Sequence, residues 1–240
     1  SFVGDGIYKS TDGGSNWIHL VNGLPDTVWS GAGLAIAPDS SHKLYLGTIY
    51  PQGSLFRSTN GGINWSEITT IPWQISGDLS SAYGGVSVVK TTSDKRIFIS
   101  GQRMIGFSKD DCISWDTAFS VSDFLTPSET MMNWSWYFYF SKVIQHPDDP
   151  DRLFFALSPH FYSPRSEHQG IYTSPDGGDN WYKLFEMPNY GASINVSDDG
   201  KYIFQYSNGM AIWRYEIPDS ISGIRSEEHT SELQSLLIIS

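Results

Sequence analysis

The sequence of 240 residues has little cysteine, few basic residues and no long apolar run. The single cysteine, Cys112, excludes an internal disulfide, and there is no CxxC motif or Cys/His cluster typical of zinc. We therefore expect neither a metal nor a cofactor. The formal net charge of −11 argues against a nucleic-acid groove and against binding to anionic lipid. The apolar stretches are far shorter than a membrane span, so no transmembrane helix is expected.

What the sequence does have is aromatic and apolar residues. Aromatic residues make up 15% of the chain, apolar residues make up 39%, and nine residues are Trp. This is enough apolar surface to bury a core, so long disorder is not expected. The chain begins at Ser1 without a charged region and an apolar region in succession, so no signal peptide is visible.

Four segments of the chain resemble one another. Each has a short apolar or aromatic run, then Ser-x-Asp or Ser-x-Asn, usually Gly-Gly, and a Trp seven residues after the Ser. The segments are residues 7–17, 55–65, 105–115 and 171–181. Their tryptophans are spaced by 48, 50 and 66 residues, the size of a four-stranded propeller blade with an insertion in the last interval.

The repeated segment predicts a tight turn. Paired glycines permit positive φ angles, and an Asp side chain such as that of Asp12 can accept hydrogen bonds from amides of its own turn. Asn60 keeps an acceptor oxygen for the same purpose. In the third segment Asp111 and Cys112 replace the glycines, so we expect that turn to be looser or differently shaped.

The pattern Ser-x-Asp-x-Gly-x-x-Trp resembles the Asp-box, or bacterial neuraminidase repeat. Asp-boxes occur in sialidases, xyloglucanase-type glycoside hydrolases, sortilin-type receptors and a photosystem assembly factor, all of them β-propellers. The resemblance implies an all-β propeller of four-stranded antiparallel blades, but it does not fix an activity. It gives a structural role to Ser10, Asp12, Trp17, Ser58, Asn60, Trp65, Ser108, Asp110, Trp115, Ser174, Asp176 and Trp181.

Short runs of aromatic and β-branched residues predict where the blades lie. We expect three whole blades at about 31–70, 85–120 and 141–187, and two partial blades at about 1–20 and 190–217. A closed propeller has about four to eight blades. Residues 1–218 are therefore expected to be an incomplete propeller, a fragment that lacks blades before Ser1. The alternative is a five-bladed ring in which the first and last partial blades join.

In a blade of strands A to D, the A–B and C–D turns share one face, and the B–C and D–A connections share the other. The second set is long here, and we call the surface it forms the long-loop face: residues 21–33, 69–85, 119–141 and 159–169. Aromatic rings beside polar groups suit sugar rings, and functional residues concentrate in such loops. The ligand-binding candidates are Trp29, Trp73, Tyr83, Trp134, Trp136, Tyr137, His160, Tyr162, Arg165 and His168. The alternative for each ring is packing under its own loop, and residues 131–140 fit a strand leading into the fourth blade equally well.

A glycoside hydrolase needs two carboxyl groups about 5–9.5 Å apart. Asp78, Asp123 and Glu129 are the catalytic candidates on the long-loop face. A sialidase would need an arginine triad, and this face has only Arg103 and Arg165.

These observations give three functional hypotheses. The first is a secreted or cell-surface Asp-box propeller that binds an extracellular ligand, a glycan in the first instance, on the long-loop face. The second is a xyloglucanase-like glycoside hydrolase. The third is a protein-binding scaffold of sortilin or assembly-factor type. The expected partner is thus a carbohydrate or an extracellular protein, and not a nucleic acid.

Residues 219–240 differ from the repeats, because they contain no aromatic residue and space their leucines like a helix. The stretch Arg225–Ser235, RSEEHTSELQS, is similar to a translated sequencing adapter in all eleven residues. We therefore expect a non-native tail, with adapter translation from 225, in a gene assembled from environmental reads. The alternative is a C-terminal helix.

Overall fold

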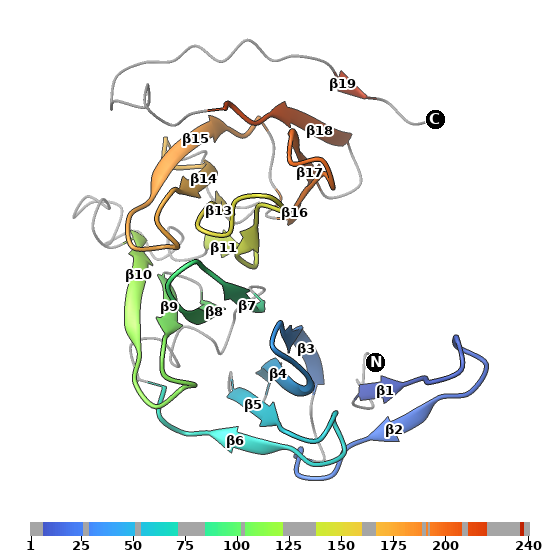
Figure 1. The fold of residues 1–240 in the computed structure, drawn as a ribbon. Coiled ribbons are helices and arrows are strands. Elements are labelled where there is room, and N and C mark those ends of the chain that lie inside the picture. The colour runs from blue at the N-terminus through green and yellow to red at the C-terminus, as the bar shows by residue number, and fades with distance from the viewer. Residues whose placement is uncertain are drawn as a thin grey trace.

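The computed structural model describes residues 7–25, 29–50, 54–71, 85–101, 104–121, 138–159, 167–188, 191, 193–207, 211–219 and 236–237. Apart from one residue in a 3₁₀ turn, all regular structure in these ranges is β-strand, paired in antiparallel sheets. The sheets follow one another around an open arc (Figure 1). The prediction of an all-β propeller is confirmed.

The sheets are numbered here as blades 1 to 5 in chain order. Blade 1 is a two-stranded ribbon of β1 (Ile7–Lys9) and β2 (Ile18–Leu20). Blade 2 consists of β3 (Trp29–Ala37), β4 (Ser40–Tyr50), β5 (Ser54–Ser58) and β6 (Ser66–Ile68). Blade 3 consists of β7 (Val86–Lys90), β8 (Lys95–Ser100), β9 (Met104–Ser108) and β10 (Asp116–Ser120).

Blade 4 has an interrupted inner strand. Both β11 (Phe138–Phe140) and β12 (Ile144–Gln145) pair with β13 (Leu153–Pro159). The sheet continues through β14 (Gly170–Ser174) to β15 (Tyr182–Glu186). Residues 138–140 are therefore a strand leading into the fourth blade, one of the two alternatives for residues 131–140; the rest of that stretch lies outside the described residues.

Blade 5 consists of β16 (Ser193–Val196), β17 (Tyr202–Ser207), β18 (Ala211–Glu216) and the two-residue β19 (Leu236–Leu237). Leu236 and Leu237, which the leucine spacing assigned to a helix, pair with Trp213 and Ile212 instead. Blades 1 and 5 form separate sheets and lie at the two ends of the arc (Figure 1). The non-native origin of residues 225–240 stays a prediction.

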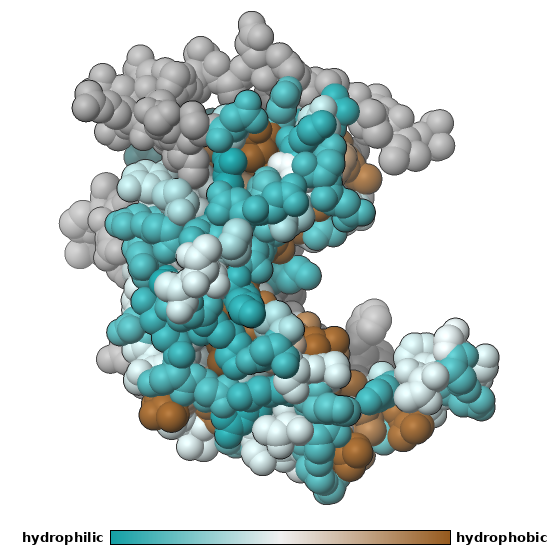
Figure 2. Space-filling model, viewed as in Figure 1, coloured by the Kyte–Doolittle hydropathy of each residue, from teal (hydrophilic) through white to brown (hydrophobic). Residues whose placement is uncertain are grey.

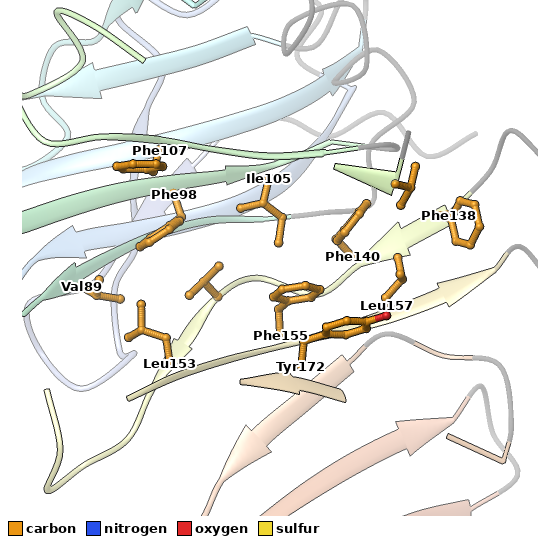
Figure 3. Close-up of a cluster of buried hydrophobic side chains, with 12 residues drawn as sticks. Val89, Phe98, Ile105, Phe107, Phe138, Phe140, Leu153, Phe155, Leu157 and Tyr172 are labelled. Carbon is orange, nitrogen blue, oxygen red and sulfur yellow. The ribbon is translucent and has the colours of Figure 1, made fainter. Parts of the chain in front are cut away.

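The core lies between the blades rather than within them. One cluster joins Phe98 and Phe107 of blade 3 to Phe155 and Tyr172 of blade 4, and all four are buried (Figure 3). Similar clusters lie at the other three contacts between successive blades. Because side chains alternate across a strand, each central blade buries both of its faces. Hydrophobic residues still reach the surface along the inner side of the arc and at parts of its rim (Figure 2).

The repeated turns lie on the same face as the A–B turns. The Gly61 amide donates to the carbonyl of His42, at 2.8 Å, and the Gly177 amide donates to the carbonyl of Asp151, at 2.7 Å. The B–C and D–A connections therefore leave from the opposite ends of the sheets, as predicted. Within the described part of the chain, the structure contains no helix long and apolar enough to cross a membrane.

Candidate functional site

The repeated turn is held by its own side chains. In the fourth copy the Ser174 hydroxyl donates to Asp176 Oδ1, at 2.8 Å, and accepts from the Gly178 amide, at 2.7 Å. Asp176 also accepts from the amide of Asn180, at 2.9 Å, and from its side chain, at 2.6 Å. The Trp181 indole N–H donates to the Gly178 carbonyl, at 3.1 Å. The turn thus uses both carboxylate oxygens of its Asp.

The same arrangement occurs in the other copies. Asp12 accepts from the amide and the side chain of Asn16, and these hydrogen bonds lower its pKa to about 2. The hydroxyl and the amide of Ser114 lower the pKa of Asp110 to about 2 in the same way. Asn60 accepts from the Asn64 amide, at 2.9 Å, as its side-chain oxygen allows. Asp12 and Asp110 are therefore ionised, and their carboxylate oxygens accept hydrogen bonds from donors of their own turns. This suits a structural role and not that of a catalytic acid.

The expectation that the third turn is looser or differently shaped is wrong. Asp111 and Cys112 adopt φ angles of 62° and 70°, close to the 72° and 92° of Gly61 and Gly62. This left-handed backbone is costly for residues with a side chain. It persists because Ser108 and Asp110 keep the bonds of the turn.

Contacts with blade 2 also hold the third turn. The Asp111 carboxylate accepts from Lys43 Nζ, at 2.6 Å, from Arg57 Nη1, at 3.0 Å, and from the Tyr45 hydroxyl. Cys112 is buried against Tyr45 and Leu55. The Asp and Cys that replace glycines are thus part of the contact between blades.

Most of the predicted site residues lie outside the described residues. These are the catalytic candidates Asp78, Asp123 and Glu129 and the binding candidates Trp73, Tyr83, Trp134, Trp136, Tyr137, His160, Tyr162 and Arg165. Trp29 begins β3, where its backbone pairs opposite Tyr50. His168 lies in the connection between β13 and β14; its carbonyl accepts from the Tyr172 hydroxyl, at 2.8 Å, and its Nε2 lies 3.6 Å from Glu167 Oε1.

The inner strands of blades 2 to 5 line a cavity of about 420 Å³. Leu34 and Ile36 of β3 line it and are about half exposed, whereas Lys142, Asn195 and Asp198 contribute polar side chains. Ser87 also lines the cavity, and its buried hydroxyl has no hydrogen-bond partner among the described residues. The lining residues of this cavity were not among the predicted site residues, because they come from the inner strands of four different blades.

The turn after β12 begins His-Pro-Asp-Asp. His146 Nδ1 accepts from the amides of Asp148 and Asp149, both at 3.2 Å, and His146 Nε2 lies 2.9 Å from the Gly200 carbonyl. The imidazole therefore caps a turn and bridges blade 4 to blade 5.

No protein-family model matches the chain. A xyloglucanase from Paenibacillus sp is 26% identical over 231 residues, which cover 85% of this chain and 21% of that protein. The chain is similar to a xyloglucanase. It thus spans about a fifth of the length of this relative.

Solved structures of other proteins share the propeller architecture of this chain. A GH74 enzyme from Niastella koreensis matches with a TM-score of 0.64 and 18% identity, over 89% of this chain and 32% of that one. The GH74 xyloglucanase from Xanthomonas campestris matches with a TM-score of 0.62 and 14% identity, over 90% of this chain and 34% of that one. At these identities the likeness shows the propeller fold and nothing finer.

Proposed function

We propose that this chain is a propeller segment of a secreted or cell-surface protein and that it binds a xyloglucan-type glycan on its long-loop face. The similarity to the Paenibacillus xyloglucanase, which extends over 85% of the chain, is the observation that carries the proposal. In this account the four repeated turns are Asp-boxes.

The difference between the two faces of the propeller supports this proposal. The face with the repeated turns is occupied by hydrogen bonds within turns and by contacts between blades. The sequence assigns the long connections to the opposite face, and Trp73, Trp134 and Trp136 belong to these connections. Aromatic rings stack on the apolar faces of sugar rings, and polar groups bind the hydroxyls. A rigid stack of sheets would hold such groups in place.

Hydrolysis is the second candidate function, and the xyloglucanase relative favours it. The catalytic carboxyl groups would come from Asp78, Asp123 and Glu129, since a glycosidase needs an acid and a second carboxylate at a defined separation. Asp12, Asp110 and Asp176 are poor candidates because turn donors occupy their carboxylate oxygens.

A panel of soluble polysaccharides tests both candidates on the 240-residue chain. Retention on xyloglucan without release of reducing ends would support binding alone. Release that Asp78→Asn or Asp123→Asn abolishes would support hydrolysis, and Asp116→Asn at the exposed start of strand β10 is the matched control. Neither retention nor release on any glycan would reject both candidates and favour the protein-binding scaffold.

A further inference from the structure

The second of the four repeated turns differs from the others at one atom. In the other three copies, the second carboxylate oxygen of the turn Asp accepts a hydrogen bond of 2.6 Å from the side chain four residues further along. The second turn has Asn60 instead, so a side-chain NH₂ group takes the place of that oxygen. Among the residues that the structure describes, Asn60 Nδ2 has no hydrogen-bond partner. The second turn therefore lacks one bond that the other turns have.

The donor for the missing bond is already present. Asn64 lies four residues after Asn60, at the position from which an Asn side chain donates in the first and fourth turns. Asn64 Oδ1 accepts from the side chain of Asn22, whereas Asn64 Nδ2 donates to no acceptor within the described ranges. A carboxylate at position 60 would thus meet an N–H donor that has no other partner there.

The surroundings of the second turn also suit a negative charge. Hydrogen bonds within their turns lower the pKa of Asp12 and Asp110 to about 2, so this type of turn favours a carboxylate over a neutral group. Lys9 Nζ lies 3.4 Å from the Gly61 carbonyl, which places a cation beside the second turn. An aspartate at position 60 should therefore be held more firmly than the Asn that the sequence encodes.

Asn60 is followed by Gly61, and Asn-Gly is the pair that deamidates most readily in proteins. Glycine has no Cβ atom to obstruct its own amide nitrogen, so that nitrogen can reach the side-chain carbonyl of the preceding Asn. The Gly61 nitrogen forms a bond to Asn60 Cγ, the Cγ–Nδ2 bond breaks, and ammonia leaves with the amide proton. Water then opens the resulting succinimide ring and leaves a carboxylate.

Two donors of the turn act on the carbonyl group that reacts. The Ser58 hydroxyl and the Asn64 amide donate to Asn60 Oδ1, at 3.0 and 2.9 Å. Donors on a carbonyl oxygen stabilise the negative charge that develops there when the carbon is attacked. Attack of water at Cγ yields aspartate, whereas attack at the main-chain carbonyl yields isoaspartate. The same two donors therefore favour the aspartate product.

The backbone of the turn disfavours isoaspartate as well, because isoaspartate inserts a methylene group into the main chain between residues 60 and 61. The Gly61 amide donates to the His42 carbonyl, at 2.8 Å. A Cβ atom at Gly62 would already lie 2.8 Å from Leu20 of blade 1. A longer main chain would break the first contact and press on the second.

We propose that Asn60-Gly61 is a site of spontaneous deamidation and that the second turn converts to the aspartate form of the other three. The conversion adds a negative charge and allows one more hydrogen bond, donated by Asn64 Nδ2. It consumes water, releases ammonia and needs no enzyme. The second turn thus acquires after synthesis the carboxylate that the other three turns have from the gene.

Peptide mapping by mass spectrometry, with chromatographic separation of the two products, tests the proposal after incubation of the 240-residue chain at mildly alkaline pH. Aspartate should be the main product at Asn60 in buffer. The ratio of aspartate to isoaspartate should be at least about threefold higher in buffer than in concentrated urea, as one hydrogen bond would produce. Asn22-Gly23 is the matched control, because Asn22 Oδ1 accepts no hydrogen bond among the described residues and its ratio should hardly change.

The Asn60→Asp variant supplies the product directly. It should raise the midpoint of thermal unfolding by about 1–4 °C, as one added hydrogen bond does in a chain of this size. The gain should shrink in an Asn64→Ala background, where the donor is missing. Failure of Asn60 to convert while Asn22 converts would overturn the proposal. Isoaspartate as the main product in buffer, or an Asn60→Asp variant less stable than the parent, would overturn it too.

Discussion

At the scale of single residues, the repeated turn depends on one side-chain acceptor. The Asp or Asn oxygen receives amides from three and four residues further along the chain, as Asp176 does from Asp179, at 3.1 Å, and Asn180. An amide that loses its side-chain acceptor loses a hydrogen bond of the turn, whereas exchange of one acceptor for another keeps that bond. The charge of the carboxylate is therefore less important to the turn than its oxygen atoms.

Asp176→Ala and Asp176→Asn separate these two contributions. We expect Asp176→Ala to lower the free energy of unfolding by about 0.5–2 kcal/mol, as loss of a side-chain cap does, because the exposed amides of Asp179 and Asn180 lose their acceptor. Asp176→Asn should cost much less, since Asn60 has the same role in the second turn. Urea denaturation followed by Trp fluorescence measures both values. Equal losses for the two variants would show that the turn needs the charge.

The lowered pKa values of Asp12 and Asp110 predict how stability depends on pH. Both fall from 3.8 to about 2 because the ionised forms accept hydrogen bonds from their turns. A group whose pKa is lower in the folded state stabilises the fold above its unfolded pKa, and that stabilisation is lost as pH falls through the folded pKa. The midpoint of thermal unfolding should therefore fall between about pH 4 and pH 2. The Asp12→Asn, Asp110→Asn double variant should show a weaker fall in that range, and an unchanged pH profile would contradict the assignment.

Cys112 should be chemically inert while the protein is folded. Burial raises the pKa of its thiol to about 12, and the side chain is 4% exposed, so the reactive thiolate is scarce and shielded. Alkylation by iodoacetamide, followed by mass spectrometry, should be at least about a hundredfold slower in buffer than in concentrated urea. Similar rates would mean that the third turn opens readily.

At the scale of elements, the cations at the contacts between blades couple one sheet to the next. The Arg96 side chain is 3% exposed and reaches across from β8 to Asp179, with nitrogen to oxygen distances of 2.7 and 3.2 Å. The hydrogen bond from Arg96 lowers the pKa of Asp179. Arg96 also donates to Asp94 in its own blade, so the charge is shared between two blades.

A double-mutant cycle with Arg96→Met and Asp179→Asn tests this coupling. We expect a coupling energy of about 0.5–3 kcal/mol, typical of neighbours in one hydrogen-bond network. The exposed pair Lys201 and Asp199, 3.9 Å apart within one turn, is the matched control and should couple by less than about 1 kcal/mol. Equal coupling energies for the two pairs would contradict a special role for Arg96.

The elements also show what local sequence can and cannot predict. The repeated turn and its Trp predicted the propeller fold correctly, because the bonds of Ser174 and Asp176 are all made within eight residues. The prediction for the third turn was wrong, because its left-handed backbone is held by Lys43 and Arg57, more than fifty residues away. The pairing of Leu236 with Trp213 likewise joins two segments that are not neighbours along the chain.

At the scale of the whole molecule, the fold could be predicted and the site only in part. The period of the Trp residues matches the size of a blade, and the resemblance of the repeated turn to the Asp-box implied the propeller. A cavity lined by four inner strands depends on how the sheets are arranged, which no single segment encodes. The candidate acids Asp78 and Asp123 lie in different connections, so their separation is likewise not contained in the sequence.

The central claim is that the long-loop face binds a xyloglucan-type glycan. Affinity electrophoresis in native gels that contain xyloglucan tests it most directly, with dextran gels as the control. We expect xyloglucan to slow the migration of the 240-residue chain and dextran to leave it unchanged. A Trp134→Ala, Trp136→Ala double variant should migrate more freely in xyloglucan, provided that its thermal unfolding matches the parent. Equal migration of the parent chain in both gels would contradict the claim.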